Sequence, residues 1–148
     1  MAAVTGDDHA RGVPGWHVYM TTLSGVLAAT ATRRTPVWVA PYNVELGEVA
    51  IINSTVVTGN NTNRKNINVI DGAAEGAGTD EIGNRDLATG TDLEVGKTLL
   101  FDNIQGASAE RFMSGGDILE VEYEQVGAGV LINETAVYIV YRPANLTS

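Results

Sequence analysis

The most informative pattern of polar and apolar positions lies between residues 56 and 79. An apolar run ends in the loop Gly-Asn-Asn-Thr-Asn at 59–63, and the alternation Asn-Ile-Asn-Val follows at 66–69. Alternation with a period of two is typical of a β-strand with one solvated face. Asn and Gly accept left-handed backbone angles at little cost, so the loop can reverse the chain. We therefore expect residues 67–70 to pair, across this loop, with a long strand at 46–57.

The same reasoning predicts strands along most of the chain. Pro36 and Pro41 flank one of them and confine it to a sheet edge or a short strand, because proline cannot donate to a ladder. The further strands are expected at residues 16–20, 37–39, 81–87, 97–101, 117–126 and 136–142. About eight short strands separated by turn signals predict an all-β, antiparallel sandwich or barrel.

The segment 117–126 alternates most clearly. Apolar side chains occupy one face and glutamates the other: Leu119, Val121 and Tyr123 against Glu120, Glu122 and Glu124. The glutamate row is interpreted as the solvated face of a strand, where like charges also discourage edge-to-edge aggregation. It is suited as well to pairing with basic residues of a partner.

Two segments do not fit the strand pattern cleanly. Residues 23–32 mix alanine, which favours helix, with threonine and valine, which favour strand, so both structures stay open there. Residues 106–113 are compatible with one helical turn capped by Ser108.

The chain is expected to form one domain. A chain of 148 residues can bury a sufficient core without disulfides, and none can form because cysteine is absent. Residues 1–15 are polar and interrupted by glycine and proline, so they are interpreted as a flexible N-terminal arm. Such an arm is either disordered or becomes ordered on a neighbouring subunit or partner. A β-sandwich domain is expected over 16–143, followed by a short tail at 144–148.

The charge of the chain argues against two classes of partner. Lys and Arg number 9 against 18 Asp and Glu, a formal net charge of −9. Binding to nucleic acid or to an anionic membrane depends on Lys and Arg, so neither is expected. The first twelve residues lack the basic and apolar regions of a secretory signal, and 23–32 is too short to cross a bilayer. We expect a soluble protein made in the cytoplasm.

The candidate catalytic and ligand-binding motifs are weak. Residues 90–98 have the glycines and the Gly-Lys-Thr of a phosphate-binding loop, but five residues separate the glycines where four are needed. The two histidines, His9 and His17, supply neither a triad nor a zinc site. The acidic residues lack the spacing of a calcium loop. We therefore expect no enzymatic activity, no cofactor and no metal.

Four segments together resemble a known family. They are Val-Thr-Gly-Asn-Asn-Thr-Asn at 57–63, the glycine-rich loop at 72–79, Leu-Ala-Thr-Gly-Thr-Asp-Leu at 87–93, and Gly-Gly-Asp-Ile-Leu-Glu-Val-Glu at 115–122. This pattern of turns and strands is similar to that of head decoration (capsid cement) proteins of tailed bacteriophages, over about residues 56–142. The chain departs from the pattern at Arg64 and Lys65, where an aromatic and a small residue are expected, and residues 1–40 have no counterpart.

The resemblance implies a jelly-roll-like domain that acts as a structural protein of the virion. Such a protein assembles as a homotrimer, binds the major capsid protein on the outer surface of the assembled head, and stabilises the shell. Arginine and aromatic residues in or near loops are the side chains expected to contact the shell, because such residues dominate protein interfaces. These candidates are Arg11, Trp16, Arg33, Arg34 and Tyr42. For Trp16 and Tyr42 a place in the core is the alternative.

An alternative hypothesis is a binding module of a phage fibre or cell surface. In that case Trp38 and Tyr42 would be exposed and would stack on sugar rings, while loop Asn and Asp residues would bond to the hydroxyl groups.

Overall fold

The computed structural model of the chain describes residues 15–23, 27–100 and 112–144. Within these ranges every regular element is a strand. The strands are β1 (His17–Leu23), β2 (Arg33–Val39), β3 (Val44–Asn53), β4 (Arg64–Asp71), β5 (Asp80–Asp86), β6 (Gly96–Leu99), β7 (Phe112–Met113), β8 (Ile118–Val126) and β9 (Thr135–Pro143).

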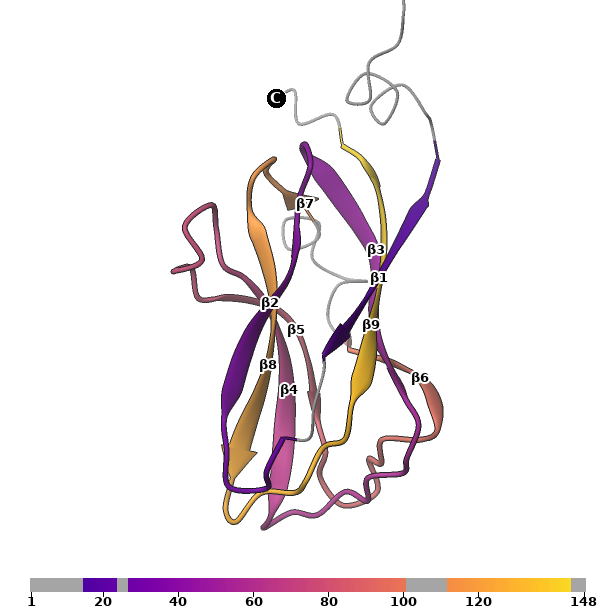
Figure 1. The fold of residues 1–148 in the computed structure, drawn as a ribbon, viewed down its shortest axis with the longest axis vertical. Helices are drawn as coiled ribbons and strands as arrows, with labels where there is room; N and C mark the ends of the chain where they lie inside the picture. Colours follow the sequence, from indigo (N-terminus) through magenta and orange to yellow (C-terminus); the bar gives the residue numbers. More distant parts are fainter. Residues whose placement is uncertain (1–14, 24–26, 101–111, 145–148) are drawn as a thin grey trace, which may run out of the picture.

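The strands form two antiparallel sheets that pack face to face (Figure 1). One sheet has the order β1-β9-β3-β6, with the short β7 beside β3, and the other has the order β2-β8-β4-β5. The buried apolar side chains of the two sheets form a single cluster between the layers. The expectation of an all-β, antiparallel sandwich is confirmed, and the sandwich rather than the barrel is the form found.

With β7 set aside, the pairing follows a simple rule. The first strand pairs with the last, the second with the second to last, and so on inward: β1 with β9, β2 with β8, β3 with β6 and β4 with β5. The contacts β9–β3 and β8–β4 then complete each sheet. This nested arrangement of eight strands in two sheets is a jelly roll.

The expected hairpin between 46–57 and 67–70 is wrong. β3 pairs with β9 and β6, whereas β4 pairs with β8 and β5 in the opposite sheet. The connection at 54–63 crosses from one sheet to the other, and it is held by a bridge from Val57 to Leu93 and a bond from the Asn60 N–H to the Leu87 carbonyl. β3 and β4 follow each other in the chain but lie in different sheets, and their apolar faces pack against each other across the core.

The segments 23–32 and 106–113, for which helix was considered, form no helix where the structure describes them. Leu23 ends β1, and Leu27 forms an isolated bridge with Ile132 before a turn. Of the segment 106–113, only Phe112 and Met113 are described, and they form β7. Of the expected arm and tail, only Gly15 and Ala144 lie within the described residues.

The alternation predicted for β8 is present, but Glu120 of the predicted solvated row is only 6% exposed and pairs with Arg34. Leu119, Val121 and Tyr123 are buried in the core, and Glu122 and Glu124 lie on the outer face of their sheet. Burial does not follow polarity everywhere, because Lys65 of β4 is completely buried.

The ammonium group of Lys65 is satisfied by backbone carbonyls. Its Nζ donates to the carbonyls of Ala29, at 2.8 Å, Ala28 and Ala31. Burial lowers the pKa of Lys65. The side chain therefore ties the turn after Leu27 to the middle of the second sheet.

Candidate interaction surface

The outer face of the sheet β1-β9-β3-β6 carries a continuous set of apolar side chains. In β9 the inward residues Val137 and Ile139 belong to the core, so the residues between and beside them point outward. We call the following set the apolar face: Trp16, Val18, Met20, Ile52, Ala136, Tyr138 and Val140.

Strand register places members of the apolar face side by side. Val18 of β1 lies opposite Val140, and Met20 lies opposite Tyr138. On the other side of β9, Ala136 lies opposite Ile52 of β3. Side chains directly opposite each other in an antiparallel pair are in contact range, so these residues form one patch and not scattered positions.

Several members are unusually exposed for their size. Trp16, Val18 and Met20 each leave about half of their surface in solvent. Isolated exposed apolar residues are normal on protein surfaces, but a contiguous patch indicates a surface that another molecule covers.

Two ion pairs border the apolar face. Arg142 bonds to Glu45 at 2.6 Å, and Lys97 pairs with Glu48. The Nζ of Lys97 also lies 5.0 Å from the centre of the Tyr138 ring, and the bond to Glu48 raises the pKa of Lys97. Because each base has an acid beside it, the border adds no net charge to the face.

Trp16 is held at the edge of this face by two contacts. Its ring lies 4.6 Å below the guanidinium of Arg142, a cation–π distance. The ring also rests against Gly47, where a Cβ atom would lie 2.6 Å from it. The glycine in β3 therefore makes room for the tryptophan.

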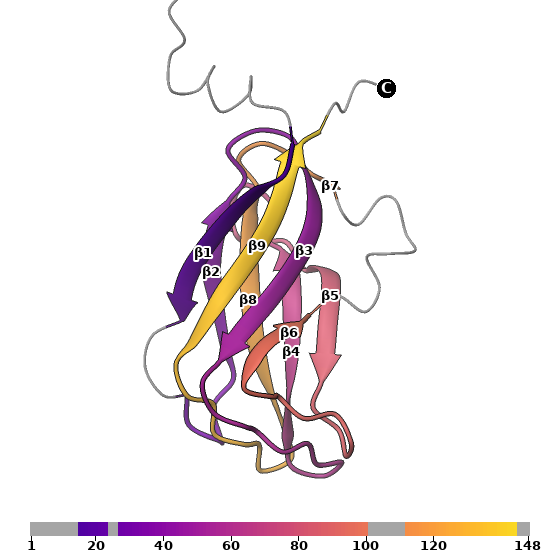
Figure 2. The same ribbon diagram turned by 90° about the vertical axis from the view of Figure 1, so that its right-hand side faces the viewer.

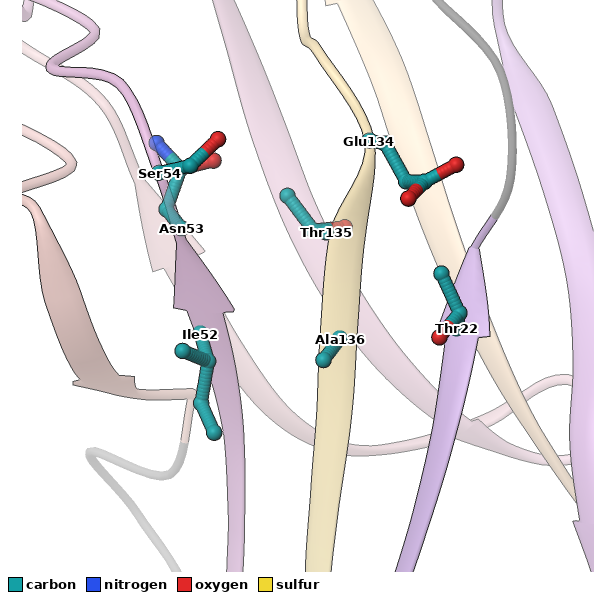
Figure 3. Close-up of a pocket in the computed structure, with 7 residues that line it drawn as sticks. All are labelled: Thr22, Ile52, Asn53, Ser54, Glu134, Thr135 and Ala136. Carbon is teal, nitrogen blue, oxygen red and sulfur yellow. The ribbon is translucent and has the colours of Figure 1, made fainter.

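A hollow of about 250 Å³ continues the apolar face at the ends of β1, β9 and β3 (Figure 3). Its lining combines apolar and polar groups: Thr22, Ile52, Asn53, Ser54, Glu134, Thr135 and Ala136. Asn53 is only 2% exposed, and its amide nitrogen donates to the Thr55 carbonyl, while its Oδ1 has no partner. The Asn53 side chain is therefore closed off from solvent, and the exposed polar groups of the hollow are those of Thr22, Ser54 and Glu134.

The outer face of the opposite sheet has a different character. Amides and carboxylates cover it and bond to one another, twice between β4 and β8 and once within β5. These bonds are Asn66–Glu124 at 3.2 Å, Asn68–Glu122 at 3.1 Å and Asn84–Glu81 at 2.6 Å. The molecule thus has one apolar sheet face and one acidic sheet face.

The structure separates the contact residues that the sequence suggested. Trp16 lies on the apolar face, whereas Arg33 and Arg34 belong to β2 in the other sheet. Arg34 bonds to the Glu120 carboxylate and the Gly78 carbonyl. Tyr42 lies between β2 and β3 and packs against the core. Arg11 lies outside the described residues.

The expectation of an exposed Trp38 is wrong. Trp38 is 8% exposed, and its ring lies 4.7 Å from that of Tyr141 and 6.4 Å from that of Tyr19. It fills the core beside the β1–β9 pair because its register partner Leu119 points inward.

Sequence reasoning did not identify Val18, Met20, Tyr138 or Val140 as surface residues of interest. A signal for Tyr138 and Val140 existed in 136–142, where both sets of alternating side chains are largely apolar. A strand of a two-layer sandwich has only one face against the core, so apolar residues on both faces indicate a second covered surface.

Two further features are absent from the part of the chain that the structure describes. No three His, Asp or Glu side chains gather there in a way that could hold a metal ion. None of these residues belongs to a helix with the length and apolar character that spanning a bilayer requires.

Comparison with known proteins adds no relative: no protein-family model, no curated protein and no solved structure matches this chain.

Proposed function

We propose that this chain is a structural protein that decorates the head of a tailed bacteriophage. It binds the major capsid protein on the outer surface of the assembled shell as a homotrimer and stabilises that shell. The observation that carries the proposal is the apolar face, a contiguous apolar sheet surface on a chain of net charge −9.

The chemistry of the apolar face suits contact with a protein lattice. Covering apolar area stabilises a complex by about 25 cal/mol per Å², without the desolvation cost that charged groups carry. The compensated pairs Glu45–Arg142 and Glu48–Lys97 at its border supply polar contacts at the rim.

Trimer formation would raise the affinity for the shell well above that of a single copy. Once one copy of a trimer is bound, the others meet the shell at high effective concentration, so weak faces give tight holding. Contacts across the boundary between capsid subunits oppose their separation, which is the task of a decoration protein.

The proposal is tested with two matched lysine substitutions. Met20 on the apolar face is 53% exposed, and Val39 on the opposite sheet is 54% exposed. We expect the wild type and Val39→Lys to sediment with heads assembled without this protein, and Met20→Lys to bind at least tenfold more weakly. Light scattering should give the mass of a trimer.

Two results would contradict the proposal. One is a wild-type chain that does not sediment with heads, and the other is equal binding by both lysine variants. A monomeric mass by light scattering would contradict the part of the proposal that concerns the trimer.

The second candidate function is carbohydrate binding, and a groove on the acidic sheet favours it. The groove is lined by Asn66, Asn68, Glu81, Asn84, Asp86 and Glu124. Amides and carboxylates are the groups that bond to sugar hydroxyls. Binding on a glycan array, lost in Asn68→Ala and combined with no affinity for heads, would favour this function over decoration.

A further inference from the structure

The four edges of the two sheets are not equally protected. A free strand edge presents unpaired N–H and C=O groups, and proteins blunt such edges with proline, bulges, charges or short strands. β2 contains Pro36 and a register shift beside it. β5 has a register shift against β4 and carries four charged residues, and β6 has only four residues.

β1 has none of these protections. It is seven residues long, and its register with β9 runs from His17 to Leu23 without a shift. Residues 18–22 read Val-Tyr-Met-Thr-Thr, with no charge and no proline. Among the described residues, β9 is the one strand that pairs with β1, and Figure 2 shows β1 at the margin of its sheet.

Charge indicates what can approach this edge. Two copies of a chain with a net charge of −9 repel one another over most orientations, and the acidic sheet face makes contact through that side costly. The edge of β1 carries no charge at residues 18–22, and the apolar face beside it has compensated ion pairs. A second copy therefore meets the least repulsion at this edge.

We propose that β1 pairs with β1 of a second copy, antiparallel and across a two-fold axis perpendicular to the sheet. Directly opposite residues of such a pair point to the same face of the sheet. Even-numbered residues of one copy must therefore lie opposite even-numbered residues of the other, if the two apolar faces are to lie on the same side. Full overlap of the seven residues then places Met20 opposite Met20 and Val18 opposite Thr22. The two sheets become one, and their apolar faces merge into a surface of twice the size.

The contact is weak by itself. One strand edge buries less than the roughly 1,200 Å² of a stable interface, so the pair is populated at high protein concentration and not in dilute solution. The inference goes beyond the proposed function and does not depend on it. The two are compatible, because two-fold axes relate neighbouring three-fold sites on a closed shell, and β1 would then join copies from adjacent trimers.

Cysteine trapping tests both the pairing and its register, because the chain contains no cysteine. Opposite residues of an antiparallel pair have Cα atoms about 4.5–5.5 Å apart, within the range of a disulfide. We expect Met20→Cys alone to form a covalent dimer under mild oxidation. Val18→Cys alone should stay monomeric on a denaturing gel, because its two copies lie about 13 Å apart along the strands. A mixture of Val18→Cys and Thr22→Cys should give a covalent heterodimer.

Val39→Cys is the control, because Val39 lies on the opposite sheet and is as exposed as Met20. Its yield of covalent dimer measures disulfide formation by random collision. Covalent dimer of Met20→Cys at the Val39→Cys level would overturn the proposal. Equal yields from Met20→Cys and Val18→Cys alone would overturn the register. Thermal unfolding of each reduced variant establishes that it is folded, and all four sites are exposed strand positions that tolerate a cysteine.

Discussion

Tyr123 joins the two sheets through its hydroxyl group. It extends from β8 into the core, where its oxygen lies 2.7 Å from the Thr135 Oγ1 of β9 in the opposite layer. Burial raises the pKa of Tyr123 to about 12, because the phenolate would lose its hydration. A single residue thus couples the packing of the sandwich to its response to alkali.

This coupling predicts a pH dependence of stability. An unfolded tyrosine ionises near pH 10 while the folded one stays neutral to about 12, so the unfolded state releases its proton first. The free energy of unfolding should therefore fall by about 1.4 kcal/mol per pH unit between pH 10 and 12 through this residue. Denaturant unfolding at several pH values measures the slope.

Tyr123→Phe provides the comparison. The variant should lose about 1 kcal/mol at pH 7, because Thr135 loses its partner, and should lose this part of the alkaline slope. An unchanged slope in the variant would contradict the assignment. Tyr138→Phe, at a partly exposed tyrosine, serves as the control.

Lys65 illustrates a residue whose environment the sequence could not predict. Its position alternates correctly with the buried Ile67 and Val69, but a lysine is normally solvated. Its burial depends on carbonyls of Ala28, Ala29 and Ala31, more than 30 residues earlier in the chain. Such partners exist only after the fold has formed.

At the scale of the element, β3 determines the shape of the apolar face. Its register with β9 shifts between Leu46 and Glu48, so Gly47 lies in a bulge. The missing side chain at this position lets the Trp16 ring lie against the strand. A local irregularity in one strand therefore positions the largest side chain of the face.

Alanine at two glycine positions should change the free energy of unfolding by very different amounts. The three atoms nearest to a Cβ at Gly47 all belong to the ring of Trp16, which can move, so Gly47→Ala should change the free energy of unfolding by less than about 1 kcal/mol. The displaced ring should become more accessible to acrylamide in fluorescence quenching.

A Cβ at Gly59 would instead lie 1.9 Å from the Ala88 carbonyl oxygen and 2.6 Å from that of Thr91. Backbone cannot move aside cheaply, so Gly59→Ala should cost about 3 kcal/mol. Equal stability of the two variants in urea would show that the crossing loop is not packed as described.

At the scale of the whole molecule, the last strand completes the fold. β9 lies between β1 and β3 and contributes Val137 and Ile139 to the core. Because its partner β1 stands at the other end of the described chain, the first sheet can form only after nearly all residues are present. Long-range pairing of this kind is slow to form.

A chain that ends at Glu134 should therefore fail to fold. Without β9, β1 has no partner among the described strands, and β3 keeps only the short strands β6 and β7 as partners. We expect no cooperative thermal transition by circular dichroism, whereas a chain that ends at Ala144 retains β9 and should unfold cooperatively. A sharp transition in the shorter chain would contradict this account of the topology.

The fold class and most strand positions could be predicted because alternation is a local property. In β8 the apolar residues Leu119, Val121 and Tyr123 lie in the core as the sequence indicates, and in β9 every second residue from Val137 points inward. The hairpin between β3 and β4 was predicted wrongly, because an Asn-rich loop reverses the chain equally well within one sheet or between two. Of the apolar face, only Trp16 was predicted from the sequence. Its other members become neighbours through strand register, which the sequence does not show.

The sequence by itself determined that this protein consists of antiparallel strands with turns of glycine and asparagine, and that it carries excess negative charge. Only the tertiary structure decided which strands pair, and hence that one sheet face is apolar and the other acidic. The physical reason is that backbone preference is set by neighbouring residues, whereas a surface is assembled from residues that the chain brings together from far apart.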